Sequence, residues 1–134
     1  MNLAAVMDDL AAGLETIDGL RVFGYWVDRV NPPAAIVAWP DPLSYDNTMG
    51  RGGDRTTIPI YVLAGRVDQR SARDTLARYC DGSGTHSVKQ AIDGHAATAY
   101  HSARVTRADF DSITVAGVDY LAATFQVDVI GKGT

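Results

Sequence analysis

The feature that most constrains the fold is an alternating run near the C-terminus, "DYLAATFQVDV", residues 119–129. Apolar side chains occupy every second position from Leu121 to Val129, and polar side chains such as Gln126 lie between them. A period of two residues is typical of a β-strand. The run therefore predicts a strand with one buried face and one face that meets water or a partner.

Other segments that are bounded by turn residues also indicate strands. The segment "LRVFGYWV", residues 20–27, is apolar on both faces, so we expect it to be central in the sheet or covered on both sides. Pro59 has no N–H to donate, so its strand should lie at an edge or at a bulge. The predicted strands are 20–27, 34–39, 55–65, 98–107, and a hairpin of 111–115 with 116–131 that turns near Ala116–Gly117.

Three segments have the spacing of amphipathic helices, with apolar residues three and four positions apart. They are residues 2–15, residues 68–80 and the short segment 85–92. Each has at its start a residue type whose side chain accepts hydrogen bonds from the first free N–H groups of a helix. The expected cap residues are Asn2, Asp68, and either Thr85 or Ser87.

The order of these elements is one helix, two or three strands, two helices and three strands. It indicates an α+β fold with a mostly antiparallel β-sheet, in which the N-terminal helix and the two central helices pack on one face. The length suits one domain, residues 1–134. We expect residues 131–134 to form a frayed C-terminal tail.

The segment "PDPLSYDNTMGRGGD", residues 40–54, has two prolines, three glycines and no clear periodicity. We expect a long mobile loop, because structureless loops of this length are uncommon and are often functional. Apolar side chains on this polar segment favour contact with a neighbouring subunit or another protein, so deleting residues 43–52 should prevent that assembly without unfolding the protein. The candidate interface residues are Leu43, Tyr45, Asn47, Met49, Arg51 and Arg55.

The segment "YCDGSGTHSVKQAIDG", residues 79–94, joins the two central helices. It resembles a phosphate-binding loop only in its glycines, because His86 stands where the lysine of such a loop is required. Cys80 lies on the apolar stripe of its helix, which favours a buried structural thiol over a nucleophile. We therefore interpret the segment as a joint between helices, although the start of the second helix could still hold an anion.

The sequence shows no strong pattern of catalytic or metal-binding residues. The three histidines have irregular spacing and there is one cysteine, so no zinc site is expected. Asp109 and Asp111, in "DFD", could act with His101 as a catalytic group, but two acids in a turn before a hairpin are usually solvated. No nucleophile with a base and an orienting partner can be assembled. The prediction is a protein that is not an enzyme and has no cofactor.

Composition and charge argue against several classes of protein. The net charge of −4 argues against a dedicated nucleic-acid binder. No apolar run approaches the roughly 18 residues that a membrane helix requires, so no membrane partner is expected. Asp8 and Asp9 come too early for a secretory signal. A single cysteine cannot form an internal disulfide.

The layout resembles the tail terminator, or tail-completion, proteins of long-tailed bacteriophages, particularly those of actinobacterial hosts. The likeness covers roughly residues 3–130. It is carried by "LAAVMDDLAAGLETIDGLRVFGY", by "PPAAIVAWP" with the loop "PLSYDNTMGRGG", and by the long segment "TTIPIYVLAGRVDQRSARDTLARYCDGSGTHSVKQAIDG" before a C-terminal hairpin. It is a likeness of pattern and element order, without an invariant motif.

The resemblance implies a virion protein that is assembled in the bacterial cytoplasm and lies at the neck end of the tail. Such proteins form a homo-oligomeric ring, usually a hexamer, that contacts the tail tube protein and the head-side connector protein. The ring stops tube growth, and DNA passes through it without specific binding. The alternatives are another neck or head–tail connector protein, a small α+β enzyme or ligand-binding domain, and an accessory subunit without ring symmetry.

Overall fold

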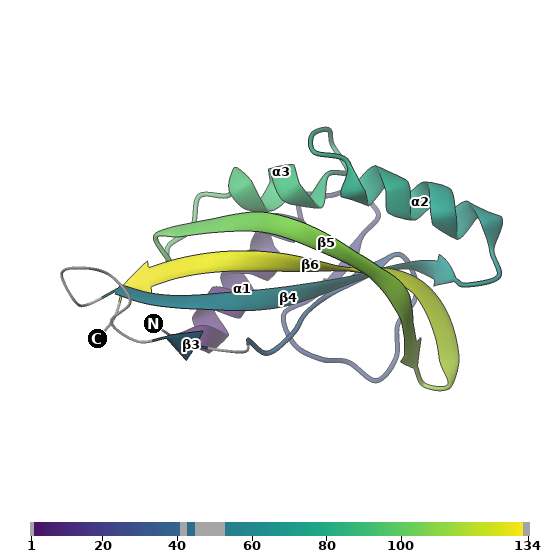
Figure 1. Ribbon diagram of the computed structural model, residues 1–134, viewed down its shortest axis with the longest axis horizontal. Helices are drawn as coiled ribbons and strands as arrows, with labels where there is room; N and C mark the ends of the chain where they lie inside the picture. Colours follow the sequence, from purple (N-terminus) through teal and green to yellow (C-terminus); the bar gives the residue numbers. More distant parts are fainter. Residues whose placement is uncertain (1, 41–42, 45–52, 133–134) are drawn as a thin grey trace.

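The computed structural model describes residues 2–40, 43–44 and 53–132. The chain forms one six-stranded sheet with the strand order β1-β2-β4-β6-β5, and β3 pairs with β4 beside this path. Figure 1 shows the long strands β4, β6 and β5 side by side. The predicted α+β class with a mostly antiparallel sheet is therefore confirmed. The elements are α1 (Leu3–Leu14), β1 (Arg21–Phe23), β2 (Ala34–Val37), β3 (Leu43–Ser44), β4 (Gly53–Arg66), α2 (Arg70–Cys80), α3 (Val88–Asp93), β5 (Ser102–Val115) and β6 (Val118–Lys132).

The long antiparallel strands β4, β6 and β5 make up most of the sheet. The predicted hairpin turn is present: Ala116 and Gly117 have φ values of 52° and 80°. Two consecutive left-handed residues form the two-residue turn whose twist matches that of the adjoining strands. At the other side of the sheet, β1 runs parallel to β2. The outermost strands of the sheet are thus the long β5 on one side and the three-residue β1 on the other.

One face of the sheet carries the main core. The apolar face predicted for the last strand, represented by Phe125 and Val127, packs with Ile58 and Ile60 of β4. All three helices contribute to the same cluster, so the helices lie on one face, as predicted. Burial of each large aliphatic side chain stabilises the fold by roughly 1.5–3 kcal/mol. The helix residues buried here are Val6, Met7, Leu10, Ala11, Leu14, Ala72, Leu76, Tyr79, Val88 and Ile92.

The opposite face is covered at one end only. Ile36, Leu63 and Tyr120 are buried there, and Val27 and Val30 from the segment between β1 and β2 pack on them. Towards the other end, β4 and β6 present half-buried side chains such as Thr124 and Gln126. We call the whole face of the sheet opposite the helices the open face.

The strand predicted over 20–27 is shorter than expected and is not central. Only β1 is extended, and it lies at the edge of the sheet. Tyr25 and Trp26 are 65% and 53% exposed, so these aromatic residues do not stand in a covered strand. The ring of Trp26 instead packs edge-on against Tyr61, with ring centroids 5.9 Å apart. The apolar residues of this segment cover the open face from a loop.

Pro59 lies in β4, which is an interior strand and not an edge. The side of its backbone that faces away from β6 lies in the gap between the end of β2 and the start of β3. Pairing of β2 with β4 ends at Ile60, and pairing of β3 with β4 begins at Thr56. The carbonyl of Pro59 accepts a hydrogen bond from the N–H of Ala38, which shows that this side of the residue faces the gap. The missing N–H therefore removes no bond to β6.

Helix starts differ from the predicted ones in two places. The cap of α1 is Asn2, as predicted, and its side chain accepts from the N–H of Ala5. For α2 the cap position is Gln69, not Asp68, and it makes no side-chain cap bond. Its amide oxygen instead accepts from the N–H of Arg66. Ser87 caps α3, whose first helical residue is Val88.

Strands also extend into segments that were predicted as loop or tail. β3 and the first two residues of β4 fall within the predicted loop 40–54. The first two residues of the predicted tail 131–134 belong to β6 and pair with β4. Residues 102–115 form one strand where two were predicted. The register with β6 shifts between Val105 and Arg107, and pairing with β6 continues on both sides of this shift.

Candidate subunit interface

The predicted interface residues are only partly described. Tyr45, Asn47, Met49 and Arg51 lie outside the described residues. Leu43 belongs to β3, where its Cα partner is Thr56. The guanidinium of Arg55 makes a bidentate ion pair with Asp128 on the open face, at 3.0 and 2.5 Å. Arg55 is thus held within its own sheet, and the interface role of these six residues remains a prediction.

The outer side of β5 provides a free sheet edge that ends in the hairpin. In a two-residue hairpin, Val115 and Val118 form a hydrogen-bonded pair, and bonded and outward residues then alternate. The outward backbone groups consequently belong to Ala108, Phe110, Ser112 and Thr114. Within the described chain β5 pairs only with β6. Unpaired strand edges of this kind invite strand addition.

Side chains of α3 bond to the backbone of this edge at Val105 and leave the edge free further towards the hairpin. The N–H of Val105 donates to Oδ1 of Asp93 at 3.0 Å, and its carbonyl accepts from Nζ of Lys89 at 3.2 Å. Lys89 and Asp93 are themselves paired at 2.7 Å, one turn apart on α3. The helix therefore satisfies both outward groups of Val105. The Ser112 N–H donates to the carboxylate of Asp111, whereas the edge groups of Phe110 have no partner among the described residues.

Side chains along this free edge differ between the two faces. Phe110 is 63% exposed and stands on the helix-covered face, because its partner on β6 is Ala123 of the main core. Asp109 and Asp111 stand on the open face. Asp109 pairs with Arg107 of the same strand at 3.2 Å. The free edge is thus apolar on one face and acidic on the other.

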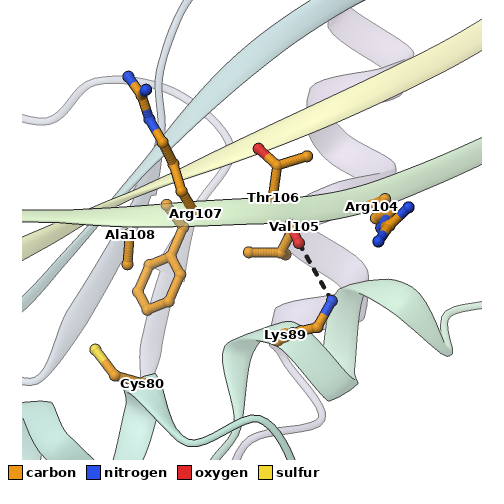
Figure 2. Close-up of a pocket in the computed structure, with 8 residues that line it drawn as sticks. Cys80, Lys89, Arg104, Val105, Thr106, Arg107 and Ala108 are labelled. Carbon is orange, nitrogen blue, oxygen red and sulfur yellow. Dashed lines mark hydrogen bonds between the residues drawn. The ribbon is translucent and has the colours of Figure 1, made fainter.

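A hollow of about 490 Å³ lies between β5 and the two central helices (Figure 2). Cys80, Val105, Ala108 and Phe125 contribute its apolar wall. The Lys89 ammonium reaches the Val105 carbonyl, whereas the guanidinium groups of the two arginines in its lining, Arg104 and Arg107, point in different directions (Figure 2). These cations do not converge on one point, and no carboxylate lines the hollow. The geometry offers no acid–base pair.

The residues considered for catalysis are not brought together. Asp109 and Asp111 lie in the middle of β5, not in a turn, and both are exposed. His101 precedes the start of the same strand, so about 24 Å of extended chain separates its neighbour Ser102 from Asp109. None of these three residues lines the hollow beside β5 or the three other hollows found among the described residues.

One polar cluster was not found from the sequence. Asp9 of α1 accepts hydrogen bonds from the backbone N–H groups of Thr98 and Ala99 at 2.8 and 2.9 Å. Its other oxygen lies 2.7 Å from Nε2 of His95. Burial opposes ionisation of Asp9, but the bonds from Ala99, His95 and Thr98 outweigh it and lower the pKa of the carboxyl group. The cluster fastens α1 to the segment between α3 and β5.

The joint between the central helices is held together by hydrogen bonds within the segment and to the first turn of α3. Ser87 accepts from the N–H of Gln90 and donates to the carbonyl of Asp81 at 2.5 Å. The Gln90 side chain accepts from the N–H of Gly84, whose φ of 113° favours glycine. Burial, with a smaller effect of Asp81, raises the pKa of the Cys80 thiol to about 11. These contacts agree with the predicted joint.

Three further observations concern a metal site, a membrane helix and similarity to known proteins, and none of them assigns a function to the chain. Within residues 2–40, 43–44 and 53–132, no three histidine, cysteine or acidic side chains are grouped so that they could hold a metal ion. Among the described helices, none combines the length and apolar character that a membrane crossing requires. A scan against models of protein families and a search of curated proteins give no match to this chain.

Proposed function

We propose that the protein is a structural component of a phage virion that resembles a tail terminator. It assembles as a homo-oligomeric ring on the head-proximal end of the tail tube, stops tube growth and joins the tail to the head-side connector. The observation that carries the proposal is the free edge of β5, an exposed stretch of strand on which the outward backbone groups of Phe110 have no partner among the described residues. A ring subunit requires such a surface for its neighbour.

The two ends of the sheet support a ring over a two-fold dimer. A closed ring needs heterologous contacts, in which one patch of a subunit meets a different patch of the next. The sheet has two unlike edges, β1 and β5, on opposite sides of three intervening strands. Each subunit can therefore contact one neighbour through β5 and the other through β1.

The open face of the sheet supports contact with large partners. It carries half-buried, uncharged side chains such as Thr57, Thr124 and Gln126, beside the Arg55–Asp128 ion pair. No helix crosses this face in the described part of the chain. The uncharged middle of this face lies between the Arg55–Asp128 pair and the two acids of the β5 edge, Asp109 and Asp111. It suits packing against the tube or the connector, because the core of a protein interface is depleted in charged residues and its rim is polar.

The enzyme alternative requires a pocket with converging polar groups. The hollow beside β5 lacks them, and His101, Asp109 and Asp111 are spread along one strand. A connector protein elsewhere in the neck would use the same edges but would not stop tube growth. The distinction between these roles is therefore functional and is settled by the effect on the tube.

The test is a tube-growth assay. Purified tail tube protein is polymerised with and without this protein, and tube lengths are measured by electron microscopy. We expect substoichiometric amounts to shorten the tubes and to stop growth when added late. Bovine serum albumin at the same concentration serves as the inert control. Unchanged tube lengths would contradict the terminator role.

A further inference from the structure

We infer that the ring is closed by strand addition between copies, with β1 of one subunit pairing antiparallel to the free edge of β5 of the next. Val22 would lie opposite Phe110, and Arg21 opposite Asp111. This inference rests on the proposed ring and names the surfaces that form it. It follows from strand direction, backbone availability, side-chain faces and charge.

Strand directions match. β1 is parallel to β2, and each subsequent pair, β2 with β4, β4 with β6 and β6 with β5, is antiparallel. β1 therefore runs antiparallel to β5. When a second copy is placed beside β5 with its helices on the same side, its β1 meets β5 in the antiparallel sense, which is the more stable pairing.

Backbone groups on the two edges match as well. The N–H of Arg21 donates to the carbonyl of Pro33, so Arg21 faces β2 and Val22 faces outward. No described residue bonds to these outward groups of Val22. On β5 the outward groups include those of Phe110. Two outward residues placed opposite each other exchange both N–H and C=O bonds, which aligns Val22 with Phe110.

Side-chain faces agree in this register. Val22 packs against the main core on the helix-covered face, and Phe110 stands on that face too. The 63% exposed Phe110 ring would be covered by the neighbour's Val22 and α1. Residues on either side of a bonded pair lie on the opposite face. Arg21 and Asp111 therefore meet on the open face.

Charge complementarity selects this partner. Arg21 is exposed and donates one bond to the Asn31 carbonyl at 3.1 Å, which leaves other guanidinium donors free. No described cation forms an ion pair with Asp111. Pairing β5 with a second β5 would instead bring Asp109 and Asp111 of the two copies together, because both acids are on one face. Like charges opposite each other disfavour that two-fold dimer.

Disulfide trapping tests the register. Val22→Cys and Phe110→Cys are combined in a Cys80→Ser background and oxidised at increasing protein concentration. Opposed bonded residues have Cα atoms about 5.5 Å apart, which suits a disulfide. Within one chain the two sites are separated by four strand spacings, about 19 Å, so no internal bond can form. We expect a ladder of covalent oligomers that ends at the ring size and returns to monomer on reduction.

Two controls make the result decisive. Val22→Cys with Val67→Cys places the second thiol at an exposed site outside β5 and should give no ladder. Asp111→Arg or Arg21→Asp in the trapping variant should each lower the yield about fivefold, the effect of a surface ion pair, and the two together should restore it. Asp74→Arg, on the exposed side of α2, is the matched charge reversal and should leave the yield unchanged.

The outcomes separate this inference from the proposed function. Monomers only, oligomers that stop at the dimer, or equal ladders from the Val67 control would overturn the strand-addition contact. If the wild-type protein still stops tube growth in those cases, the terminator role stands and a different surface closes the ring. A ladder with no effect on tube growth would support the contact and contradict the terminator role.

Discussion

The carboxylate of Asp9 in α1 lies 2.7 Å from Nε2 of His95, which is 86 residues later in the chain. The same carboxylate holds the N–H groups of Thr98 and Ala99. One side chain thereby fixes the N-terminal helix to the connection that enters β5. Gly13 lies on the other side of this contact, where an added Cβ would come within 3.0 Å of the His95 ring.

Replacing Asp9 should weaken the fold. Asp9→Ala leaves two backbone N–H groups and one imidazole without their acceptor, so the free energy of unfolding should fall by about 2–4 kcal/mol. Urea unfolding followed by circular dichroism measures it. Asp8→Ala, at the exposed neighbouring position, should change stability by less than about 0.5 kcal/mol. Equal effects of the two substitutions would contradict the clamp.

The Asp9 contribution should depend on pH. The pKa of Asp9 is lowered below its ordinary value of 3.8 in the folded protein. The unfolded chain therefore binds the proton more tightly, and the stabilisation is present above the unfolded pKa and is lost as pH falls through the folded pKa. The stability difference between wild type and Asp9→Asn should shrink between pH 6 and pH 2. A difference that stays constant with pH would contradict this assignment.

Tyr100 should tolerate loss of its hydroxyl group. The side chain is buried, and no described residue gives its hydroxyl oxygen a hydrogen bond. Burial, with the charge of Asp9 adding to it, raises the pKa of Tyr100 to about 12. Tyr100→Phe removes a desolvated polar group without breaking a bond, so stability should be unchanged or higher by up to about 1 kcal/mol. Tyr100→Ala, which empties the site, should lose about 3–5 kcal/mol.

Cys80 should react slowly with thiol reagents. A pKa of about 11 leaves roughly one thiolate in a thousand at pH 8, against about a quarter for a free cysteine. Reaction with a disulfide reagent at pH 8 should therefore be about two-hundredfold slower in the folded protein than in urea. The folded rate should rise about tenfold per pH unit up to pH 10. A fast reaction at pH 7 would show an accessible, activated thiol instead.

Amide hydrogen exchange should distinguish the closed and open parts of the β5 edge. The N–H of Val105 is bonded to Asp93 and should be protected in the monomer. The N–H of Phe110 has no partner in the described chain and should exchange rapidly. On assembly the Phe110 amide should become protected by at least about tenfold, while the protection of Val105 stays the same. Phe110 protection in the isolated monomer would contradict the open edge.

Sequence patterns predicted the parts of this fold that depend on period and turn chemistry. The alternation from Leu121 to Val129 identified the strand and its buried face, and Ala116–Gly117 identified the hairpin turn. Asn2 was found as a cap, and Ser87 as one of two candidates beside Thr85, because cap chemistry is local. The aromatic segment over 20–27 was misplaced because apolar residues on both faces do not distinguish a covered strand from a loop that covers the sheet.

The candidate site was less accessible to sequence reasoning. The free edge of β5 follows from which strands lie on its two sides, a property of topology that no local pattern encodes. The "DFD" run was placed in a turn because its alternation is weak, and the irregularity after Val105 obscures the period. Asp9 and His95 are too distant in the chain for either residue to indicate the other. An acid on the solvent side of an amphipathic helix was the only signal.

The measurement that tests the central claim most directly is electron microscopy of tail tubes incubated with this protein carrying a gold-binding tag. We predict one label cluster at a single end of each tube, with a ring-shaped density in end views. Labels spread along the tube walls, labels at neither end, or equal labels at both ends would contradict a terminator that recognises the head-proximal end.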